Sequence, residues 1–357
     1  MAAAPFVAQD LLRKVSRSFY LTIAILPGSI QKQIRLAYLL ARASDTIADT
    51  RLIRAERRHE VLLQLRDRIR AACEGRASAP LEFGDLAQAR EAISGEGTPA
   101  ERALLGSIDK LLTALRDFDV EDRSRIRKLL DTITRGQETD LVRLSPAPGM
   151  IAAFETDGEL DAYTYDVAGC VGEFWTEMCR AHVVSGAALD DPSLMERGVR
   201  FGKGLQLVNI LRDIPKDLRR GRCYIPRERL SNQGLEPAGL LERSAMERFR
   251  PIYSAYLGQA EDHLAAGWQY TVAMPFRCVR VRLACAWPLL IGARTLRLLR
   301  FGNVLDDQKG MKISRTEIRR LLLRSALLYP NPAAWDRLFD IARKGRTGSG
   351  SPGRMGL

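Results

Sequence analysis

The sequence is poor in the residues that bind transition metals or cross-link small secreted domains. Its 357 residues include three histidines without metal-ligand spacing and six scattered cysteines without a CxxC pair. Scattered cysteines in apolar contexts indicate reduced thiols, so we expect a cytoplasmic protein. Neither a Walker loop nor a GxGxxG motif occurs, so the usual sequence signatures of nucleotide binding are missing.

Long apolar runs and strand patterns are also missing. No uncharged apolar stretch reaches the ~18 residues that span a bilayer. The nearest, AWPLLIGARTLRLL, is interrupted by Arg294 and Arg297, and the N-terminus does not read as a signal peptide. Helical periodicity dominates, so we expect an all-α fold, a single helical bundle around a central cavity. We expect this domain to cover residues 1–343, with a disordered tail over 344–357.

The charge is strongly basic, with a net charge of +12 and a pI of about 9.7. An excess of positive charge favours an anionic partner, which could be nucleic acid, an acidic membrane surface or a phosphorylated substrate. The arginines are spread through predicted helices, and no zinc-finger spacing or aromatic RNA-binding signature occurs. We therefore expect no nucleic-acid partner.

Two pairs of aspartates stand four residues apart, Asp45 with Asp49 and Asp213 with Asp217. Residues at this spacing share one helix face. Two buried carboxylates on one face repel each other and are costly to desolvate, and cations remove that cost. Mg²⁺ prefers carboxylate oxygens and completes its shell with phosphate oxygens and water. We interpret the pairs as facing each other across one cavity, where Mg²⁺ binds a diphosphate, although a single DxxxD is usually a solvated helix face.

Other polar residues extend both helix faces toward the N-terminus. Tyr38 and Arg42 precede the first aspartate pair at helical spacing, and Gln206 and Asn209 precede the second. Pro215 lies between the aspartates of the second pair, and it should kink or end that helix near Asp213 because proline lacks the backbone N–H.

Four segments carry a family resemblance: SRSFYLTIAILP, YLLARASDTIAD, DAYTYDVAGCVGEFW and QLVNILRDIPKDLRRGRCYIP. They occur in the same order and at similar separations as in the head-to-head prenyl synthases, the squalene and phytoene synthases. The chain resembles this family over residues 10 to 325. The resemblance implies an isoprenoid-synthase-type bundle and a Mg²⁺-dependent prenyltransferase that uses farnesyl diphosphate.

The resemblance also implies roles for individual residues. The metal ligands would be Asp45, Asp49, Asn209, Asp213 and Asp217. The substrate-binding residues would be Ser16, Arg17, Ser18, Phe19, Tyr38, Arg42, Gln206, Asn209 and Arg222. The catalytic residues would be Tyr163, Arg212 and Asp213, with Tyr163 near the reacting carbons. Lys312 and Arg315 would bind NADPH, although Ser314 and Glu317 beside them also read as a helix capping box.

Glycines in two predicted helices have two readings. Gly169 and Gly172 could allow close helix packing or could widen a channel for a prenyl chain, since a helical glycine costs ~1 kcal/mol and needs a reason. The segment GQETDL, residues 136–141, resembles a family segment in which the glycine leaves room for that chain, and we assign no catalytic role to Asp140.

The expected reaction joins two farnesyl diphosphates into presqualene diphosphate and reduces it with NADPH to squalene. Phytoene synthases use geranylgeranyl diphosphate without a reductant, and other relatives stop at presqualene diphosphate or release dehydrogenated or hydroxylated products. The last of the four segments, together with KISR at residues 312–315, favours the squalene branch.

Because substrate and product are apolar, we expect peripheral contact with the inner face of the membrane, in a monomer or weak dimer. An alternative of another class is a non-catalytic basic helical protein that acts in membrane binding or assembly.

Overall fold

The computed structural model describes residues 3–16, 19–49, 52–79, 81, 98–147, 149–184, 191–306 and 311–344. Helices make up most of this part of the chain, and its strands are a single pair of two residues each. The prediction of an all-α fold is therefore confirmed. Arg17, Ser18 and nearly all of the predicted tail, from residue 345 onward, lie outside the described residues.

The elements have the following bounds: α1 Ala3–Val15, α2 Phe19–Ala24, α3 Gly28–Asp49, α4 Ala55–Cys73, α6 Pro99–Leu105, α7 Ile108–Arg116, α8 Val120–Glu138, the π-helical turn η1 Thr139–Arg143, β1 Ala152–Ala153, α9 Asp157–Thr164, the π-helical turn η2 Tyr165–Gly169, α10 Cys170–His182, α11 Pro192–Arg219, β2 Arg222–Cys223, α12 Arg227–Ser231, the 3₁₀ turns η4 Pro237–Leu241 and η5 Arg243–Ala245, α13 Met246–Ala273, α14 Val279–Phe301, α15 Arg315–Leu328 and α16 Pro332–Lys344.

Local sequence signals fix several helix starts. The side chain of Asp119 accepts a hydrogen bond from the backbone N–H of Asp122 and begins α8. Thr156 and Glu159 form a capping box at the start of α9. Asp191 caps α11, whose first residue is a proline. Such caps satisfy N–H groups that have no partner within the helix.

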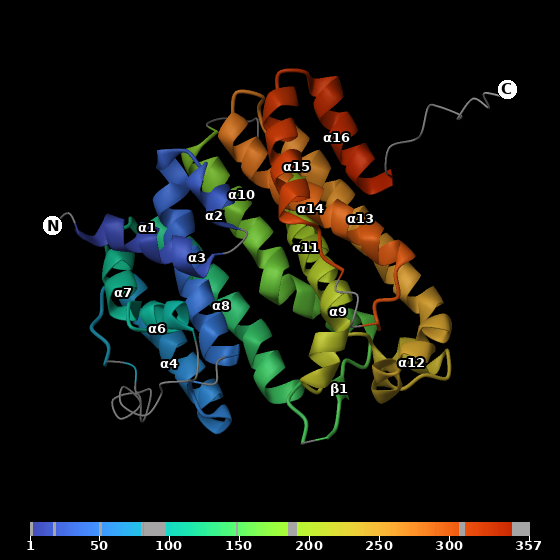
Figure 1. The fold of residues 1–357 in the computed structure, drawn as a ribbon. Coiled ribbons are helices and arrows are strands. Elements are labelled where there is room, and N and C mark those ends of the chain that lie inside the picture. Colours follow the sequence, from blue (N-terminus) through green and yellow to red (C-terminus); the bar gives the residue numbers. More distant parts are fainter. Residues whose placement is uncertain are drawn as a thin grey trace.

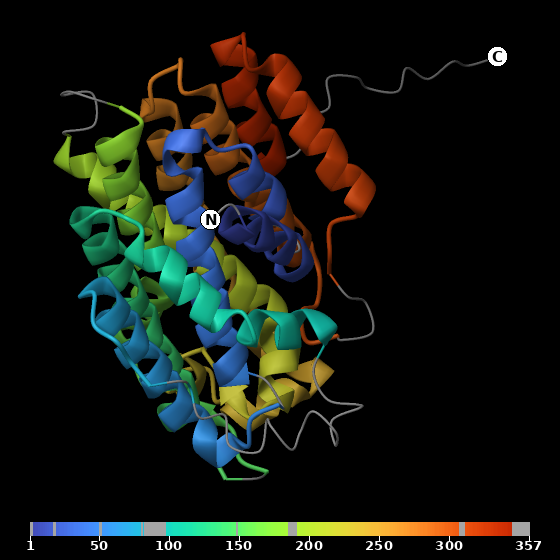
Figure 2. The ribbon, with the colours of Figure 1, turned by 90° about the vertical axis from the view of Figure 1, so that its left-hand side faces the viewer.

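The helix α11 runs through the middle of the bundle (Figure 1). In that view α3, α4 and α8 lie on one side of it and α13, α14 and α16 on the other. Its main neighbour is α13, and α10 contacts both α11 and α3. Figure 2 shows α1 in front of α3, which it contacts. The two helices that carry the aspartate pairs are thus held in place by a shared neighbour.

Glycines let α10 and η2 approach α11 closely. A Cβ atom on Gly172 would lie 1.8 Å from the carbonyl oxygen of Gly198, and one on Gly202 would lie 2.0 Å from the carbonyl oxygen of Ala168. At Gly136 a Cβ atom would lie 2.5 Å from Cγ1 of Val167. The space at these glycines is filled by a neighbouring helix, so the structure favours the close-packing reading over room for a prenyl chain.

The core divides into two clusters of buried side chains. One cluster is built mainly from α1, α3, α4, α6, α7, α8 and α10, and the other mainly from α9, α11, α13, α14 and α16. Partly buried Ile25 and Phe201 pack against both clusters. The aspartate helix α3 therefore belongs to the first cluster and α11 to the second.

A short parallel sheet fastens the basic loop that follows α11. Ala152 of β1 pairs with Arg222 of β2, and the backbone N–H of Ala152 donates to the carbonyl of Gly221 at 2.9 Å. Farther along, the N–H of Arg227 donates to the carbonyl of Phe154 at 2.8 Å. The loop is thereby held as a structured element beside the C-terminal end of α11.

Candidate active site

The first aspartate pair lies at the C-terminal end of α3. The side chain of Arg42 forms a hydrogen-bonded ion pair with Asp45, one turn away. The side chains of Asp45 and Asp49 are 45% and 46% exposed, so solvent reaches both carboxylates. Both residues lie on one helix face, as the spacing predicted.

Solvent reaches Asp45, yet protein atoms surround it closely. Burial raises the pKa of Asp45 to about 6, and the nearby carboxylates of Asp49 and Asp140 add to the rise, while Arg42 opposes it. A cation bound beside such a carboxyl would stabilise its charged form and lower its pKa.

The second aspartate pair lies on α11. The guanidinium group of Arg212 donates to both carboxylate oxygens of Asp213, at 3.0 and 2.7 Å. Burial raises the pKa of Asp217 to about 7, and the charge of Asp213 contributes to this rise. Both pairs thus combine one aspartate paired with an arginine of its own helix and a second aspartate one turn farther along.

Of the two outcomes predicted for Pro215, a kink or a helix end near Asp213, the helix end is wrong, because α11 continues through Pro215 to Arg219. A proline at position 215 leaves the carbonyl oxygen of Leu211 without its helical hydrogen bond. The hydroxyl of Tyr253, on α13, donates to that oxygen at 3.2 Å. A neighbouring helix therefore supplies the donor that the proline lacks, and α11 continues to Arg219.

Two arginines of the basic loop link the two pairs. Nη1 of Arg220 lies 3.7 Å and Nη1 of Arg222 lies 3.6 Å from the carboxylate of Asp49. The same two arginines, together with Lys216, act on Asp217 and oppose the rise of its pKa. Arg220 and Arg222 therefore stand between Asp49 of α3 and Asp217 of α11.

A third acidic side chain lies close to this loop. Asp140, in η1, accepts a hydrogen bond from the hydroxyl of Tyr163 at 2.9 Å and one from that of Tyr224 at 2.8 Å. The two phenol rings stack, with centroids 5.1 Å apart. Burial raises the pKa of Asp140, and the charge of Arg222 opposes the rise. No catalytic role was predicted for Asp140, and Tyr224 was not among the predicted site residues.

Arg222 has these carboxylates as its main electrostatic neighbours. Its side chain is 15% exposed. Burial lowers the pKa of Arg222, but Asp140, Tyr224 and Asp49 outweigh this effect, so the pKa lies above its ordinary value. A guanidinium fork at this position is suited to bind phosphate oxygens, for which the neighbouring carboxylates compete.

The predicted substrate residues of the first segment lie near α3. The hydroxyl of Ser16 donates to the carbonyl of Leu12 at 2.6 Å, which is the capping contact of an ordinary helix end. It also interacts with the phenol of Tyr38, whose pKa is raised mainly by burial. The ring of Phe19 lies 6.2 Å from that of Tyr38. Ser16, Phe19 and Tyr38 therefore form one group, and Tyr38 adjoins Arg42.

The remaining predicted residues differ in their surroundings. On α11, Gln206 is half-buried and Asn209 is exposed. Lys312 and Arg315 are exposed near the start of α15, where the hydroxyl of Ser314 accepts a hydrogen bond from the N–H of Glu317 at 3.1 Å. The capping reading of this segment is confirmed for Ser314, whereas the side chain of Glu317 pairs with Arg294.

The carboxylates suit a hard cation that also binds substrate oxygens. Within the described residues no three His, Cys, Asp or Glu side chains stand close enough to hold a metal ion by themselves. Mg²⁺ often takes one or two carboxylates and completes its shell with phosphate oxygens and water. Burial raises the pKa of Asp45 and Asp217 although basic side chains lie nearby, so an added cation would stabilise the charged form of both carboxylates. The donor set therefore fits Mg²⁺ bound together with a diphosphate.

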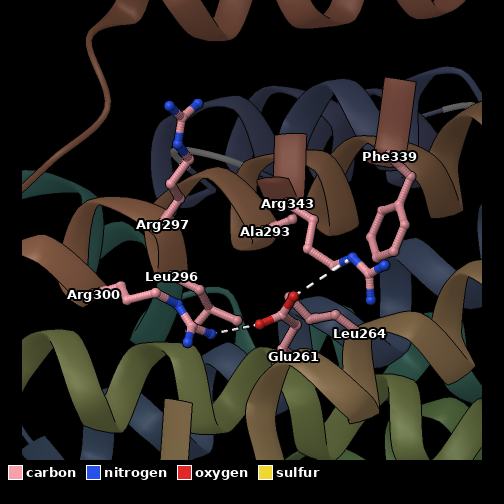
Figure 3. Close-up of a pocket in the computed structure, with 8 residues that line it drawn as sticks. All are labelled: Glu261, Leu264, Ala293, Leu296, Arg297, Arg300, Phe339 and Arg343. Carbon is pink, nitrogen blue, oxygen red and sulfur yellow. Dashed lines mark hydrogen bonds and ion pairs between the residues drawn. The ribbon is translucent and has the colours of Figure 1, made fainter. Parts of the chain in front are cut away.

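A pocket elsewhere in the molecule is unrelated to these residues. It lies between α13, α14 and α16, where Glu261 forms ion pairs with Arg300 and Arg343 (Figure 3). None of the aspartates of the candidate site lines it. Across the described ranges, every helix is too short or too polar to traverse a bilayer.

The chain is similar in sequence to known prenyl synthases. The family model described as squalene/phytoene synthase matches residues 12–317. A bifunctional lycopene cyclase/phytoene synthase of Blakeslea trispora is 27% identical over 317 residues, which are 88% of this chain and 46% of that protein. A squalene synthase of Mycosarcoma maydis is 25% identical over 87% of this chain and 53% of its own length. The chain thus spans about half the length of these curated relatives.

Solved structures agree on the fold. The structure of TcSQS in complex with the ligand E5700 superposes with a TM-score of 0.68 at 21% identity and covers 96% of this chain and 97% of that one.

Proposed function

The chain belongs to the squalene/phytoene synthase family, and on this basis we propose that it joins two farnesyl diphosphates head to head. Members of this family are prenyltransferases that act on prenyl diphosphates. The choice of farnesyl over geranylgeranyl diphosphate, and of squalene over phytoene, is part of the proposal.

The observation that carries the proposal is the pair of arginines between the aspartate helices. Arg220 and Arg222 lie within ion-pair distance of Asp49 and also act on Asp217. A diphosphate bound at this place would meet guanidinium groups from the loop and carboxylates from both helices. Carboxylates would repel it unless cations intervene, so the arrangement favours an anion that arrives with metal ions.

The chain's own residues act on the diphosphate. Arg222, held between Asp140 and Asp49, orients one phosphate group, and Arg220 adds a second cationic contact. Arg42 and Arg212 stand beside the first aspartate of each pair and supply further positive charge. Positive groups that are already in place stabilise the leaving diphosphate as the allylic carbon–oxygen bond breaks.

Mg²⁺, when bound, would be held by Asp45, Asp49, Asp213 and Asp217, with Asn209 as a further oxygen ligand, and would neutralise the charge of the leaving diphosphate. The metal assignment rests on the donor set and on the raised pKa values of Asp45 and Asp217.

We propose that Tyr163 acts from the wall of the site. Its side chain is only 6% exposed, and its hydroxyl donates to Asp140. Tyr163 would therefore contact the substrate through its ring, because its hydroxyl is already hydrogen-bonded. Aromatic and aliphatic surfaces keep water from the allylic cation, which water would otherwise convert to an alcohol.

The reductive half of the reaction is proposed from the sequence motifs. Lys312 and Arg315 are exposed, and the hydroxyl of Ser314 between them is used as a helix cap. These features do not form a built dinucleotide site, so we assign NADPH no contacts and route no step through it. Squalene remains our proposed product from the sequence motifs, and product analysis decides it.

The metal and diphosphate assignment is tested with Asp45→Asn and Asp213→Asn, which remove one charge from each pair without changing side-chain shape. We expect both variants to keep the melting temperature of the unaltered protein to within a few degrees and to lose turnover of farnesyl diphosphate by at least ~100-fold. Asp10→Asn is the matched control, since Asp10 forms an exposed helical ion pair with Lys14. Full turnover in either of the first two variants would disprove the assignment.

Product analysis separates the branches. The purified protein is incubated with Mg²⁺ and farnesyl diphosphate, with and without NADPH. Squalene only with NADPH supports the full proposal, and presqualene diphosphate in both samples identifies an enzyme of the first half-reaction. A product formed only from geranylgeranyl diphosphate moves the chain to the phytoene branch. A non-catalytic membrane or assembly protein would show no Mg²⁺-dependent stabilisation by a farnesyl diphosphate analogue.

A further inference from the structure

The helix α15 carries two apolar side chains on its outer face. Leu323 and Leu327 stand one turn apart and are 61% and 68% exposed. The opposite face packs on α14 and α16, and there Ser325 is fully buried and accepts a hydrogen bond from the indole N–H of Trp287 at 3.0 Å. Figure 2 places α15 at the outer edge of the molecule. The two leucines therefore face away from the core.

Arginines flank these leucines on both sides. With about 100° of rotation per residue, Leu323 and Leu327 fall between Arg319 on one side and Arg320 and Arg324 on the other. All three arginines are exposed. Within the described part of the chain their side chains form no ion pair or hydrogen bond. The only acidic residue of α15, Glu317, is paired with Arg294.

This outer face, defined by Arg319, Arg320, Leu323, Arg324 and Leu327, has the pattern of a helix that lies in a membrane interface. In such helices apolar side chains enter the acyl boundary while arginines at the flanks extend to the headgroups. We propose that the outer face of α15 docks the protein onto an anionic lipid surface. The inference does not depend on the proposed chemistry, since lipid binding needs no substrate.

The charge of the outer face of α15 excludes the other candidate binding partners. A second copy would bring the same three unpaired arginines and would be repelled. The chain that follows α16, residues 345–357, contains Arg346 and Arg354 and no acidic residue, so it does not complement this face. Nucleic acid would engage the arginines but would leave the two leucines in water. An anionic lipid surface offers phosphate groups to the arginines and acyl chains to the two leucines.

The test is sedimentation of the whole protein with vesicles of phosphatidylcholine, with or without phosphatidylglycerol, and without substrate or Mg²⁺. We expect binding only to the vesicles that contain phosphatidylglycerol. The triple variant Arg319→Gln, Arg320→Gln, Arg324→Gln should bind more weakly by about fivefold per arginine. The double variant Leu323→Ser, Leu327→Ser should lose at least about tenfold. Val120→Ser is the matched control, since Val120 is 64% exposed at the start of α8.

Melting temperatures of all variants, measured by circular dichroism, separate lost binding from lost folding. The proposal is overturned if the unaltered protein binds both vesicle types equally or neither. It is also overturned if both multiple variants bind as tightly as Val120→Ser. Gel filtration adds a further outcome that would overturn it: a dimer that the leucine variant converts to monomer, with vesicle binding unchanged, would make this face a contact between copies.

Discussion

The hydroxyl of Tyr224 donates a hydrogen bond to Oδ1 of Asp140, with 2.8 Å between the oxygens. The bond joins the segment after β2 to the π-helical turn η1. Tyr224 lies two residues after Arg222, and Arg222 is also an electrostatic neighbour of Asp140. One half-buried carboxylate therefore fixes the position of the loop that presents a guanidinium group to both aspartate helices.

Removing the hydroxyl in Tyr224→Phe should lower the free energy of unfolding by ~1–3 kcal/mol, because a charged, half-buried carboxylate oxygen loses its donor. The same variant should raise the KM for the diphosphate substrate more than it lowers kcat, because Arg222 loses its support. Urea denaturation and steady-state kinetics measure the two effects. Tyr165→Phe is the control, since its acceptor Glu173 keeps the charged donor Lys128, whereas Asp140 keeps the neutral donor Tyr163. An equal loss in both variants would argue against a special role for Asp140.

The missing helical hydrogen bond at Pro215 leads to a second, independent prediction. Tyr253→Phe should destabilise the protein by ~1–3 kcal/mol, because it leaves the carbonyl of Leu211 without a donor. In the background of Pro215→Ala the helix regains its own N–H for that carbonyl, so the same tyrosine substitution should cost clearly less. A double-mutant cycle by chemical denaturation measures this coupling. If the cost is the same in both backgrounds, Tyr253 does not compensate for the proline.

Close contact between α10 and α11 should make Gly172 intolerant of a side chain. Gly172→Ala places a Cβ atom 1.8 Å from the carbonyl oxygen of Gly198, so the helices must separate, and we expect a loss of ~1–3 kcal/mol. Gly258→Ala is the control within a helix, because a Cβ atom there meets nothing within 4 Å. It should stabilise the protein by up to ~1 kcal/mol through helix propensity. Thermal denaturation of the two variants gives shifts of opposite sign.

The raised pKa of Asp217 predicts how stability depends on pH without metal. The folded protein takes up a proton at this carboxyl as the pH falls through about 7, whereas the unfolded chain does so near its ordinary value of 3.8. Between these values the folded state binds more protons, so this residue lets stability increase as the pH is lowered. In EDTA, Asp217→Asn should be more stable than the unaltered protein at about pH 8, and the difference should shrink toward about pH 5. A constant difference at all pH values would contradict the assignment.

Local patterns in the sequence predicted much of the candidate site. The pairing of Arg42 with Asp45 and the shared face of each aspartate pair follow from helical spacing, which is a short-range property. The cap at Ser314 was predicted from the same kind of signal. These features depend on residues a few positions apart, and the sequence contains them in full.

The remaining parts depend on contacts between distant segments. Asp140 and Tyr224 are 84 residues apart, so no helical period connects them. The helix end wrongly predicted near Asp213 has the same origin, because the hydroxyl that compensates for Pro215 belongs to Tyr253 on another helix. The two readings of Gly172 likewise became distinguishable only when the backbone of Gly198 was placed beside it.

Asp45, Asp49 and Asp213 each lie beside at least one arginine of this same chain. The protein thus carries built-in counterions for these three aspartates. An incoming diphosphate must compete with those aspartates for the guanidinium groups, so binding is an exchange of partners. Each carboxylate released by the exchange then becomes free to hold a metal ion, which makes anion and cation binding mutually reinforcing. Affinity for the diphosphate should accordingly depend steeply on the metal concentration, and affinity for the metal on the diphosphate.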